Sequence, residues 1–332
     1  MAAASLSVKS KTASRSKRLF LAGLLLVLLL IPLLRLVYDG FNYWLHMFLY
    51  TFMYIALASS WNIIGGYTGY TSLGHNFFLA IGAYFSGVLL VYYKVSPFLT
   101  APFAGLLALG LGFLFGLISL RTRGPAFIIS TIALVLLVKI TFDNWDYIGG
   151  ANGLSMPLLD LDVSLVKVPY YYYMLFIAVA AVYTAYRIRH SKFGLGLRAI
   201  SQDESKAEVA GIPTNTYKIL AFAISGFYVG MAGAVWGHYS TYLQPKTLLA
   251  ILIAAQLVLM TVLGGKGTVA GPVIGAILFI AAEEYFVTAL GSSELNIAAM
   301  GLLLAVVLLF FPEGIVGSLR NRGRLPPILD WD

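Results

Sequence analysis

Long apolar runs recur along most of this 332-residue chain, and they constrain its fold more than any other feature. A helix needs about 20 residues to cross a hydrocarbon core of about 30 Å, because it rises about 1.5 Å per residue. The runs are continuously apolar and do not alternate in segments of about ten residues, which argues against a transmembrane β-barrel. Charged residues make up only 11% of the chain, whereas soluble domains carry about 25%. The sequence therefore predicts an all-α polytopic membrane protein.

About ten apolar runs are candidate spans, and we take residues 19–318 as a single transmembrane domain. A basic tail over residues 1–18 precedes this domain, and a second tail over residues 319–332 follows it. We expect the first run to be a retained span, not part of a cleaved signal or transit peptide, because no small-x-small cleavage site follows it. The predicted spans are residues 19–34, 43–64, 77–93, 98–120, 127–142, 170–186, 219–242, 248–263, 269–288 and 295–311.

Small residues recur every four positions in two of these runs. Such faces let helix backbones approach closely where lipid supplies no hydrophobic driving force, so we expect both to be packing surfaces. One face carries Ala104, Ala108, Gly112 and Gly116, and the other carries Gly226, Gly230 and Ala234.

Charge is distributed unevenly between the connecting segments. The loop over residues 143–169 carries four aspartates and one lysine, whereas the link over residues 190–217 and its flanks are rich in lysine and arginine. The positive-inside rule places the loop outside and the link in the cytoplasm, and ten spans then place both termini in the cytoplasm. The formal charge of +8 thus reflects topology and implies no nucleic-acid partner.

Few residues suggest chemistry within the spans. Arg35, Lys139, Glu283 and Glu284 fall near predicted span ends, where we expect their charged groups to snorkel to the interface. The chain contains no cysteine, which excludes disulfides and thiolate metal sites. His75 has no second histidine or carboxylate at metal-ligand spacing, so we expect no metal site.

A glycine-rich polar segment over residues 61–76 separates the second and third runs. Its glycines, hydroxyls and amides do not suit a lipid-facing helix, and irregular backbone at membrane depth requires cover from protein or a cavity. We expect a broken helix that lines a translocation path, with a half-helix N-terminus suited to a carboxylate; a plain cytoplasmic loop is the alternative. The candidate path residues are Asn62, Gly65, Gly66, Tyr67, Gly69, Ser72, Gly74 and His75.

The link over residues 190–217 contains helix start and stop signals. Ser201 and Glu204 have the spacing of a capping box, and Gly211 followed by Pro213 is a stop signal, which predicts a short helix over residues 202–210. This helix joins predicted spans six and seven and carries small residues among charges, as a docking element would; a solvated linker helix is the alternative. The candidate docking residues are Ser201, Asp203, Glu204, Ala207 and Gly211.

Two further glycine-rich segments are predicted to be turns. The segment over residues 264–272 lacks the Ser or Thr after lysine that a phosphate-binding loop needs, so we expect a tight turn with close packing. Its glycines are Gly264, Gly265, Gly267 and Gly271. The outer loop contains an ordered entrance turn or a flexible stretch at Gly149, Gly150, Asn152 and Gly153.

In this order, the segments resemble the permease subunits, of the M-subunit type, of branched-chain amino acid ABC transporters. The resemblance runs from about Trp44 to Gly317. It implies a type II ABC importer-like fold and a heterodimer with a second permease, in the cytoplasmic (inner) membrane of a prokaryote. It also implies two cytoplasmic ATPases and a periplasmic or extracellular substrate-binding protein. The family's E-x-x-A-x-x-x-G coupling helix corresponds to Glu204, Ala207 and Gly211.

The resemblance implies a permease subunit that forms half of a path for branched-chain or related hydrophobic amino acids. Such a subunit is no enzyme and needs no cofactor, because the partner ATPases hydrolyse ATP. Import of urea, short amides or aromatic acids by the same kind of transporter is an alternative. An ATP-independent secondary transporter would show intramembrane ionisable pairs or matched broken helices. An intramembrane enzyme would need a catalytic constellation within the spans.

Overall fold

The computed structural model describes residues 20–36, 39–158, 165–291, 293–326 and 330–331, so the predicted tail over residues 1–18 lies outside the described part. Eight helical units in this part are long and apolar enough to cross a membrane. The protein is therefore an all-α multi-pass membrane protein. The units are α2 (Asn42–Gly65), α3 (His75–Tyr93), α4 (Pro97–Ser119), α5 (Pro125–Asp143), α6 (Lys167–Arg189), α9 (Thr214–Ser240), α10 (Pro245–Leu248) with α11 (Ile251–Gly264), and α12 (Ala270–Leu290).

The first and last predicted spans form shorter apolar helices in the described residues. A helix covers Phe20–Arg35, and its final part is a 3-10 helix, η1 (Ile31–Leu36), where Pro32 has no backbone N–H to donate. This helix docks on α6, since the hydroxyls of Tyr171 and Tyr172 donate to the carbonyls of Leu28 and Leu29. The last run forms α13 (Ser293–Phe310). A count of ten spans thus remains a prediction.

The predicted eighth span, over residues 248–263, agrees with the candidate span Pro245–Gly264, but this span contains an interruption near its start. Its first helix, α10, ends at Leu248, and α11 begins at Ile251. The carbonyl of Ala250, between them, accepts a hydrogen bond of 3.0 Å from the side-chain amide of Asn76. The interruption therefore faces the start of α3. It could not be predicted from the sequence, because the predicted run contains no glycine or proline.

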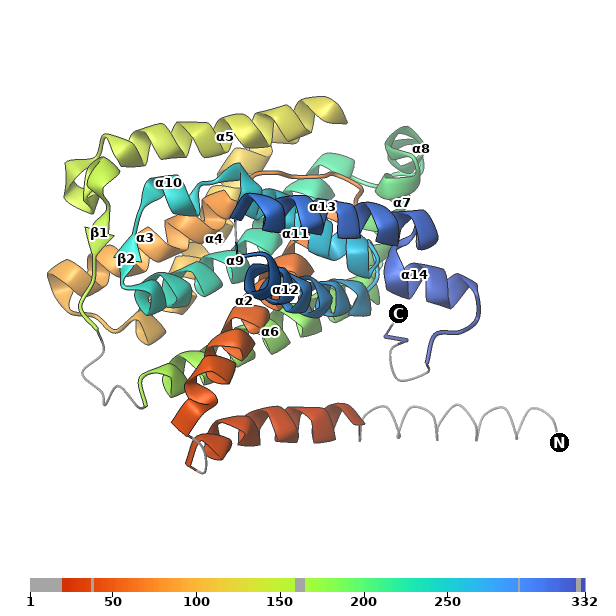
Figure 1. Ribbon diagram of the computed structural model, residues 1–332. Helices are drawn as coiled ribbons and strands as arrows, with labels where there is room; N and C mark the ends of the chain where they lie inside the picture. The colour runs from red at the N-terminus through yellow and green to blue at the C-terminus, as the bar shows by residue number, and fades with distance from the viewer. Residues whose placement is uncertain (1–19, 37–38, 159–164, 292, 327–329, 332) are drawn as a thin grey trace.

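The two ends of the bundle differ (Figure 1). At one, β1 (Leu154–Ser155) pairs antiparallel with β2 (Tyr242–Leu243), after the 3-10 turns η3 (Asp146–Ile148) and η4 (Gly150–Asn152). At the other lie α7 (Lys192–Gln202), α8 (Glu204–Val209) and α14 (Gly314–Asn321). We call these the strand end and the α8 end. By the positive-inside rule they would be the outer and cytoplasmic ends.

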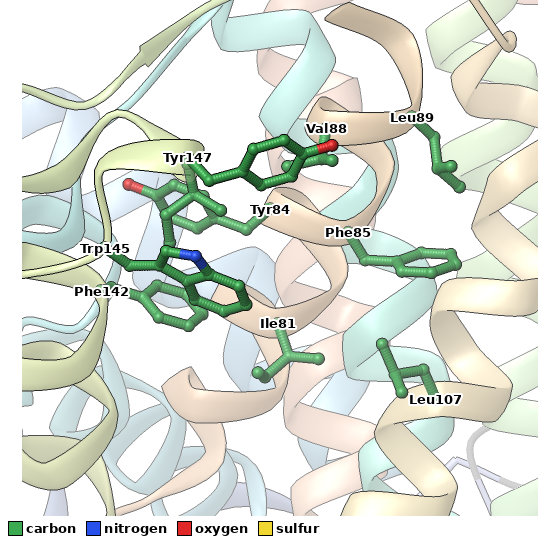
Figure 2. Close-up of a pocket in the computed structure, with 10 residues that line it drawn as sticks. Ile81, Tyr84, Phe85, Val88, Leu89, Leu107, Phe142, Trp145 and Tyr147 are labelled. Atoms are coloured by element: carbon green, nitrogen blue, oxygen red, sulfur yellow. The ribbon is translucent and has the colours of Figure 1, made fainter. Parts of the chain in front are cut away.

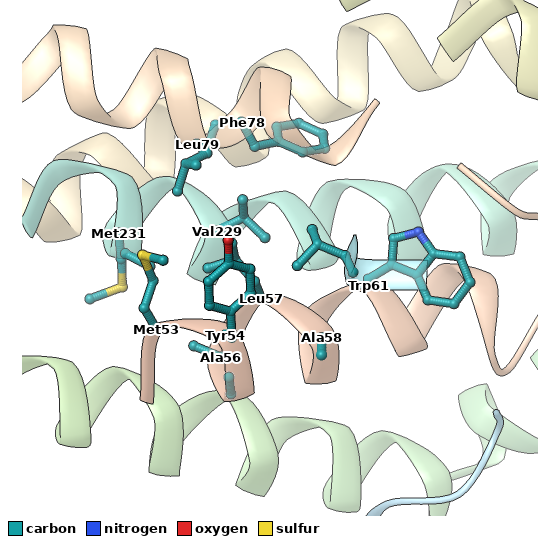
Figure 3. Close-up of a cluster of buried hydrophobic side chains, with 14 of the residues drawn as sticks. Met53, Tyr54, Ala56, Leu57, Ala58, Trp61, Phe78, Leu79, Val229 and Met231 are labelled. Atoms are coloured by element: carbon teal, nitrogen blue, oxygen red, sulfur yellow. The ribbon is translucent and has the colours of Figure 1, made fainter. Parts of the chain in front are cut away.

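The core forms where α9 packs against α3 and α4. A Cβ atom at Gly230 would lie 2.5 Å from the Cβ of Ala108, and one at Gly82 would lie 1.9 Å from the carbonyl oxygen of Gly230. The two small-residue faces thus meet, which confirms the packing prediction. Figure 3 shows a cluster of buried hydrophobic side chains from the core, including Trp61 from α2, Phe78 from α3 and Val229 from α9.

Candidate functional site

The glycine-rich segment over residues 66–74 connects two complete helices. The prediction that this segment interrupts one broken helix is wrong, because α2 and α3 are each long enough to cross a membrane. The backbone N–H groups of Gly66 and Tyr67 both donate to the carbonyl of Asn62, which ends α2. The next nine residues are non-helical, and α3 begins at His75.

Protein groups satisfy the polar atoms of this connecting segment. The indole Nε1 of Trp61 donates to the carbonyl of Ser72 at 2.8 Å, and the backbone N–H of Leu73 donates to Oγ1 of Thr131 at 3.2 Å. Both ring nitrogens of the buried His75 lie near serine hydroxyls, 3.1 Å from Ser72 and 3.0 Å from Ser225 of α9. The irregular backbone is thus hydrogen-bonded to neighbouring elements, and its end at His75 is bonded to α9.

Asn62, near the end of α2, forms hydrogen bonds with the turn between α11 and α12. Its amide donates to the carbonyl of Thr268 at 2.8 Å, and its Oδ1 accepts from the N–H of Gly267 at 2.9 Å. Gly265 and Gly267 adopt positive φ in this turn, and a Cβ at Gly264 would lie 1.7 Å from the carbonyl oxygen of Gly271. The structure therefore brings two of the four predicted segments together.

Most of the predicted path residues are buried in the chain. Asn62, Gly65, Tyr67, Ser72, Gly74 and His75 are buried, Gly66 is half-buried and Gly69 is exposed. A shallow apolar pocket of about 250 Å³ is lined by other side chains, among them Tyr84, Phe85 and Trp145 (Figure 2). A path role for these eight residues stays a prediction.

A buried ion pair joins the connecting segment to α8. Lys218, in the second turn of α9, is 1% exposed, and its Nζ donates to Oε1 of Glu204 at 2.6 Å, to the Tyr70 hydroxyl at 3.2 Å and to the carbonyl of Leu120 at 3.3 Å. An ammonium has three N–H donors, so all three are satisfied. The Tyr70 hydroxyl donates in turn to Oε2 of Glu204.

Arg123 completes what we call the Glu204 cluster, comprising Tyr70, Arg123, Glu204 and Lys218. Its Nε lies 3.5 Å from Oε1 of Glu204, and its guanidinium also pairs with the exposed Glu208. Burial raises the pKa of Glu204, but the hydrogen bonds from Lys218 and Tyr70 and the two positive charges outweigh it, so the pKa lies below its ordinary value. Burial and the nearby carboxylate raise the pKa of Tyr70, which therefore stays protonated and donates.

The short helix α8 begins later than predicted, and the capping box at Ser201 is wrong. Ser201 lies within α7, an amphipathic helix whose N-cap is Ser191, and its side chain is exposed. Asp203 breaks from helical geometry and caps α8 instead, since its Oδ1 accepts from the N–H of Lys206 at 3.0 Å. The predicted stop at Gly211 agrees with the structure, because Gly211 adopts a φ of +86° one residue beyond the C-cap.

The motif residues of α8 face inward. Ala207 is buried, and the Glu204 side chain is only 12% exposed because Lys218 and Tyr70 cover it. Lys206, Glu208 and Val209 present the outer surface instead, and Val209 is 91% exposed. One face of α8 is therefore anchored and the other is open to solvent.

The predicted entrance residues lie at the strand end. Gly149, Gly150 and Gly153 adopt positive φ, and the Tyr242 hydroxyl donates to the carbonyl of Asn152 at 2.5 Å. Their segment is thus tied to the loop after α9, and residues 159–164 of the outer loop lie outside the described part.

Sequence reasoning missed three members of the Glu204 cluster. Arg123 lies between two predicted spans, Lys218 lies in the basic flank of the link, and Tyr70 is one aromatic residue in a glycine-rich segment. None of them belongs to a motif that predicts the cluster. The sequence offered no signal for Lys218, because the predicted seventh span begins at residue 219 and left this lysine in the link, whereas α9 begins at Thr214 and includes it.

Comparisons with known proteins cover most of the chain. A family profile described as "Branched-chain amino acid transport system / permease component" matches residues 44–311. The chain is 26% identical over 302 residues to the high-affinity branched-chain amino acid transport system permease protein LivM of Escherichia coli (strain K12), covering 83% of this chain and 70% of that protein. No solved structure matches.

Two other relatives match over shorter stretches. The high-affinity branched-chain amino acid transport system permease protein BraD of Pseudomonas aeruginosa is 30% identical over 130 residues, 39% of this chain and 41% of that protein. The ribose import permease protein RbsC of Haemophilus influenzae is 29% identical over 200 residues, 57% of this chain and 60% of that protein. The similarity therefore extends to permeases named for different solutes.

Proposed function

The chain belongs to the branched-chain amino acid transport system permease family, and from this premise we propose that it is a membrane-spanning subunit of an ATP-driven importer. It forms half of a path for branched-chain or related hydrophobic amino acids in the inner membrane of a prokaryote. A second permease subunit supplies the other half, two cytoplasmic ATPases supply energy, and a periplasmic or extracellular binding protein delivers the substrate.

The arrangement of α8 carries this proposal. Its open face presents Lys206, Glu208 and Val209, while its inner face is held by the Glu204 cluster. A partner that binds the open face and moves α8 would therefore pull on Tyr70 and Lys218 through the Glu204 carboxylate. Tyr70 belongs to the connecting segment, whose Ser72 and His75 contact α9. Such a displacement reaches α3 and α9 through contiguous hydrogen bonds.

Substitution of the exposed tip of α8 tests the docking role. Val209→Asp should lower ATP hydrolysis stimulated by leucine-loaded binding protein about tenfold or more, because it places a charge in the proposed contact. Leu195→Asp on α7 is the matched control, since Leu195 is also an exposed apolar residue of the link. Equal stimulation in both variants and the wild type, with intact folding, would contradict docking through α8.

Substrate identity requires a direct measurement, because RbsC is named for ribose and LivM for branched-chain amino acids. We expect ATP-dependent uptake of labelled leucine into vesicles that contain the assembled transporter. Excess isoleucine and valine should compete, whereas urea, phenylalanine and ribose should not. Uptake that continues without ATP would indicate a secondary transporter instead.

A further inference from the structure

Polar and aromatic side chains line one face of α2 from the strand end to its middle. Tyr43, His46, Tyr50 and Tyr54 are spaced by three or four residues, so they share this face. They extend over about 16 Å of the helix axis. Four residues of neighbouring helices join them, and we call the whole set the polar strip. These are Tyr239 of α9, Gln256 of α11, and Glu283 and Glu284 of α12.

Hydrogen bonds connect the strip across the helices. Nδ1 of His46 lies 2.7 Å from the Tyr239 hydroxyl. The Tyr50 hydroxyl donates to that of Tyr54 at 3.3 Å, and Tyr54 donates to Oε1 of Gln256 at 3.2 Å. The Gln256 amide then donates to Oε1 of Glu283 at 3.5 Å. This chain of hydrogen bonds reaches deep into the bundle, since Tyr54 is buried at the centre of α2.

The structure overturns the expectation that Glu283 snorkels to the interface. Glu283 is the fourteenth of the 21 residues of α12, and its carboxylate turns toward α11. Its Oε2 is buried and has no hydrogen-bond partner. Among the described residues, no lysine, arginine or histidine forms an ion pair with it. The neighbouring Glu284 instead accepts a hydrogen bond from the hydroxyl of the exposed Tyr43, near the start of α2.

The strip is not sealed inside the chain. His46, Tyr50, Tyr239, Gln256 and Glu283 are all half-buried, in contrast to the closed core beside them. Ionisable groups at membrane depth rarely face lipid; they face a bundle interior or a water-filled cavity. The ring of Trp236 lies 5.4 Å from that of Tyr50 and 5.5 Å from that of Tyr239, which adds an aromatic wall.

We propose that the polar strip lines the translocation path and that Oε2 of Glu283 binds the ammonium group of an aliphatic α-amino acid in transit. This inference rests on the proposed import function and gives it a location. A cation stabilises a carboxylate whose oxygen is withdrawn from water and lacks a donor, and an ammonium supplies both charge and N–H donors. The neighbouring rings suit a cation and an aliphatic side chain together. The strip begins at the strand end, where a binding protein would release its substrate.

Thiol accessibility tests the path without relying on transport. The chain has no cysteine, so Tyr50→Cys introduces its only thiol, and the transporter is assembled with cysteine-free partners. A cationic methanethiosulfonate reagent should react about tenfold faster than an anionic one of similar size, because Glu283 attracts cations. Leucine should slow the reaction, and adding Glu283→Gln should abolish the charge preference. Phe176→Cys on α6, at a site 60% exposed on another face, should react with neither reagent.

Two results would overturn the inference. If Tyr50→Cys and, as a second position, Gln256→Cys are both unreactive, the strip does not face a water-filled path. Equal rates with both reagents, unchanged by Glu283→Gln, would mean that a cation of the second permease already neutralises Glu283.

Transport measurements separate this inference from the proposed function. Glu283→Gln should reduce leucine transported per ATP about tenfold while hydrolysis stimulated by loaded binding protein persists, and Glu283→Asp should restore part of the loss. Glu313→Gln, outside the strip, serves as the control. Normal coupling in Glu283→Gln would contradict the ammonium site. Charge-selective labelling without any ATP-driven uptake by the wild type would instead overturn the importer and leave a cation-attracting path.

Discussion

Lys218 carries a charge inside a membrane-spanning helix, and its surroundings explain how the chain tolerates it. Glu204, Tyr70 and the carbonyl of Leu120 satisfy its three donors, and the ring of Tyr70 lies 4.7 Å from Nζ. Removing one member of a buried pair costs more than removing both, because the remaining charge stays desolvated.

Lys218→Met should therefore lower the free energy of unfolding in detergent by about 3 kcal/mol. The double variant Lys218→Met/Glu204→Gln should lose clearly less, because no carboxylate then lacks its ammonium. Thermal unfolding of the wild type, the two single variants and the double variant forms a complete cycle. Additive losses would show that the two side chains do not interact.

The sequence pattern identified only those residues of the site that lie within one short segment of the chain. Glu204, Ala207 and Gly211 follow a spacing within one short segment, so pattern reading could find them. Tyr70 and Lys218 are 148 residues apart and carry no shared pattern. Only the packing of the connecting segment against α9 brings them together.

Among the elements, α8 shows how neighbouring signals compete. Ser201 and Asp203 are both acceptable N-cap residues, and the spacing from Ser201 to Glu204 favoured the former. The amphipathic α7 extends to Gln202 and incorporates Ser201, which leaves Asp203 to cap α8. The stop signal was reliable because positive φ at Gly211 is a backbone property with a strong residue preference.

Asp203→Ala should loosen α8 by about 1 kcal/mol, because the N–H of Lys206 loses its side-chain acceptor. Hydrogen exchange of residues 204–209 in the purified protein should accelerate about fivefold. Ser201→Ala removes the other candidate cap and should leave exchange unchanged. The opposite ranking would restore the capping box predicted from the sequence.

The contact between α3 and α9 depends on glycine at Gly82. Gly82→Ala drives a Cβ into the backbone of Gly230, so the helices must separate, and we expect a loss of about 1–3 kcal/mol in unfolding free energy. Gly110→Ala on α4 is the matched control, because a Cβ there meets nothing within 4 Å. It should be neutral or stabilise the helix by up to about 1 kcal/mol. Equal unfolding midpoints for the two variants would contradict this packing.

For the whole molecule, apolar run length predicted the helical class and most boundaries. The interruption at Ala250 and the pairing of β1 with β2 escaped it, because both depend on partners distant in the chain. Glu283 was misplaced for a related reason: distance from a span end does not reveal which neighbouring helix a side chain faces.

The orientation of the bundle follows from charge alone and is open to a direct test. Asn152→Cys at the strand end should react with a membrane-impermeant maleimide in intact cells. Lys206→Cys on α8 should react only after the membrane is permeabilised. Both positions are exposed, so accessibility does not bias the comparison. Reversed labelling would invert the molecule and remove α8 from any cytoplasmic ATPase.

The distance between Tyr70 and Lys218 also has a consequence for biogenesis. The ribosome makes about 5–20 residues per second, so roughly 7–30 s pass between the synthesis of Tyr70 and that of Lys218. Until then the Tyr70 hydroxyl lacks its partner Lys218, and the neighbouring His75 lacks its partner Ser225 on α9. During this interval the nascent chain therefore exposes a polar segment whose hydrogen bonds are incomplete. An insertase can shelter this segment at the membrane, and a quality-control protease can recognise it.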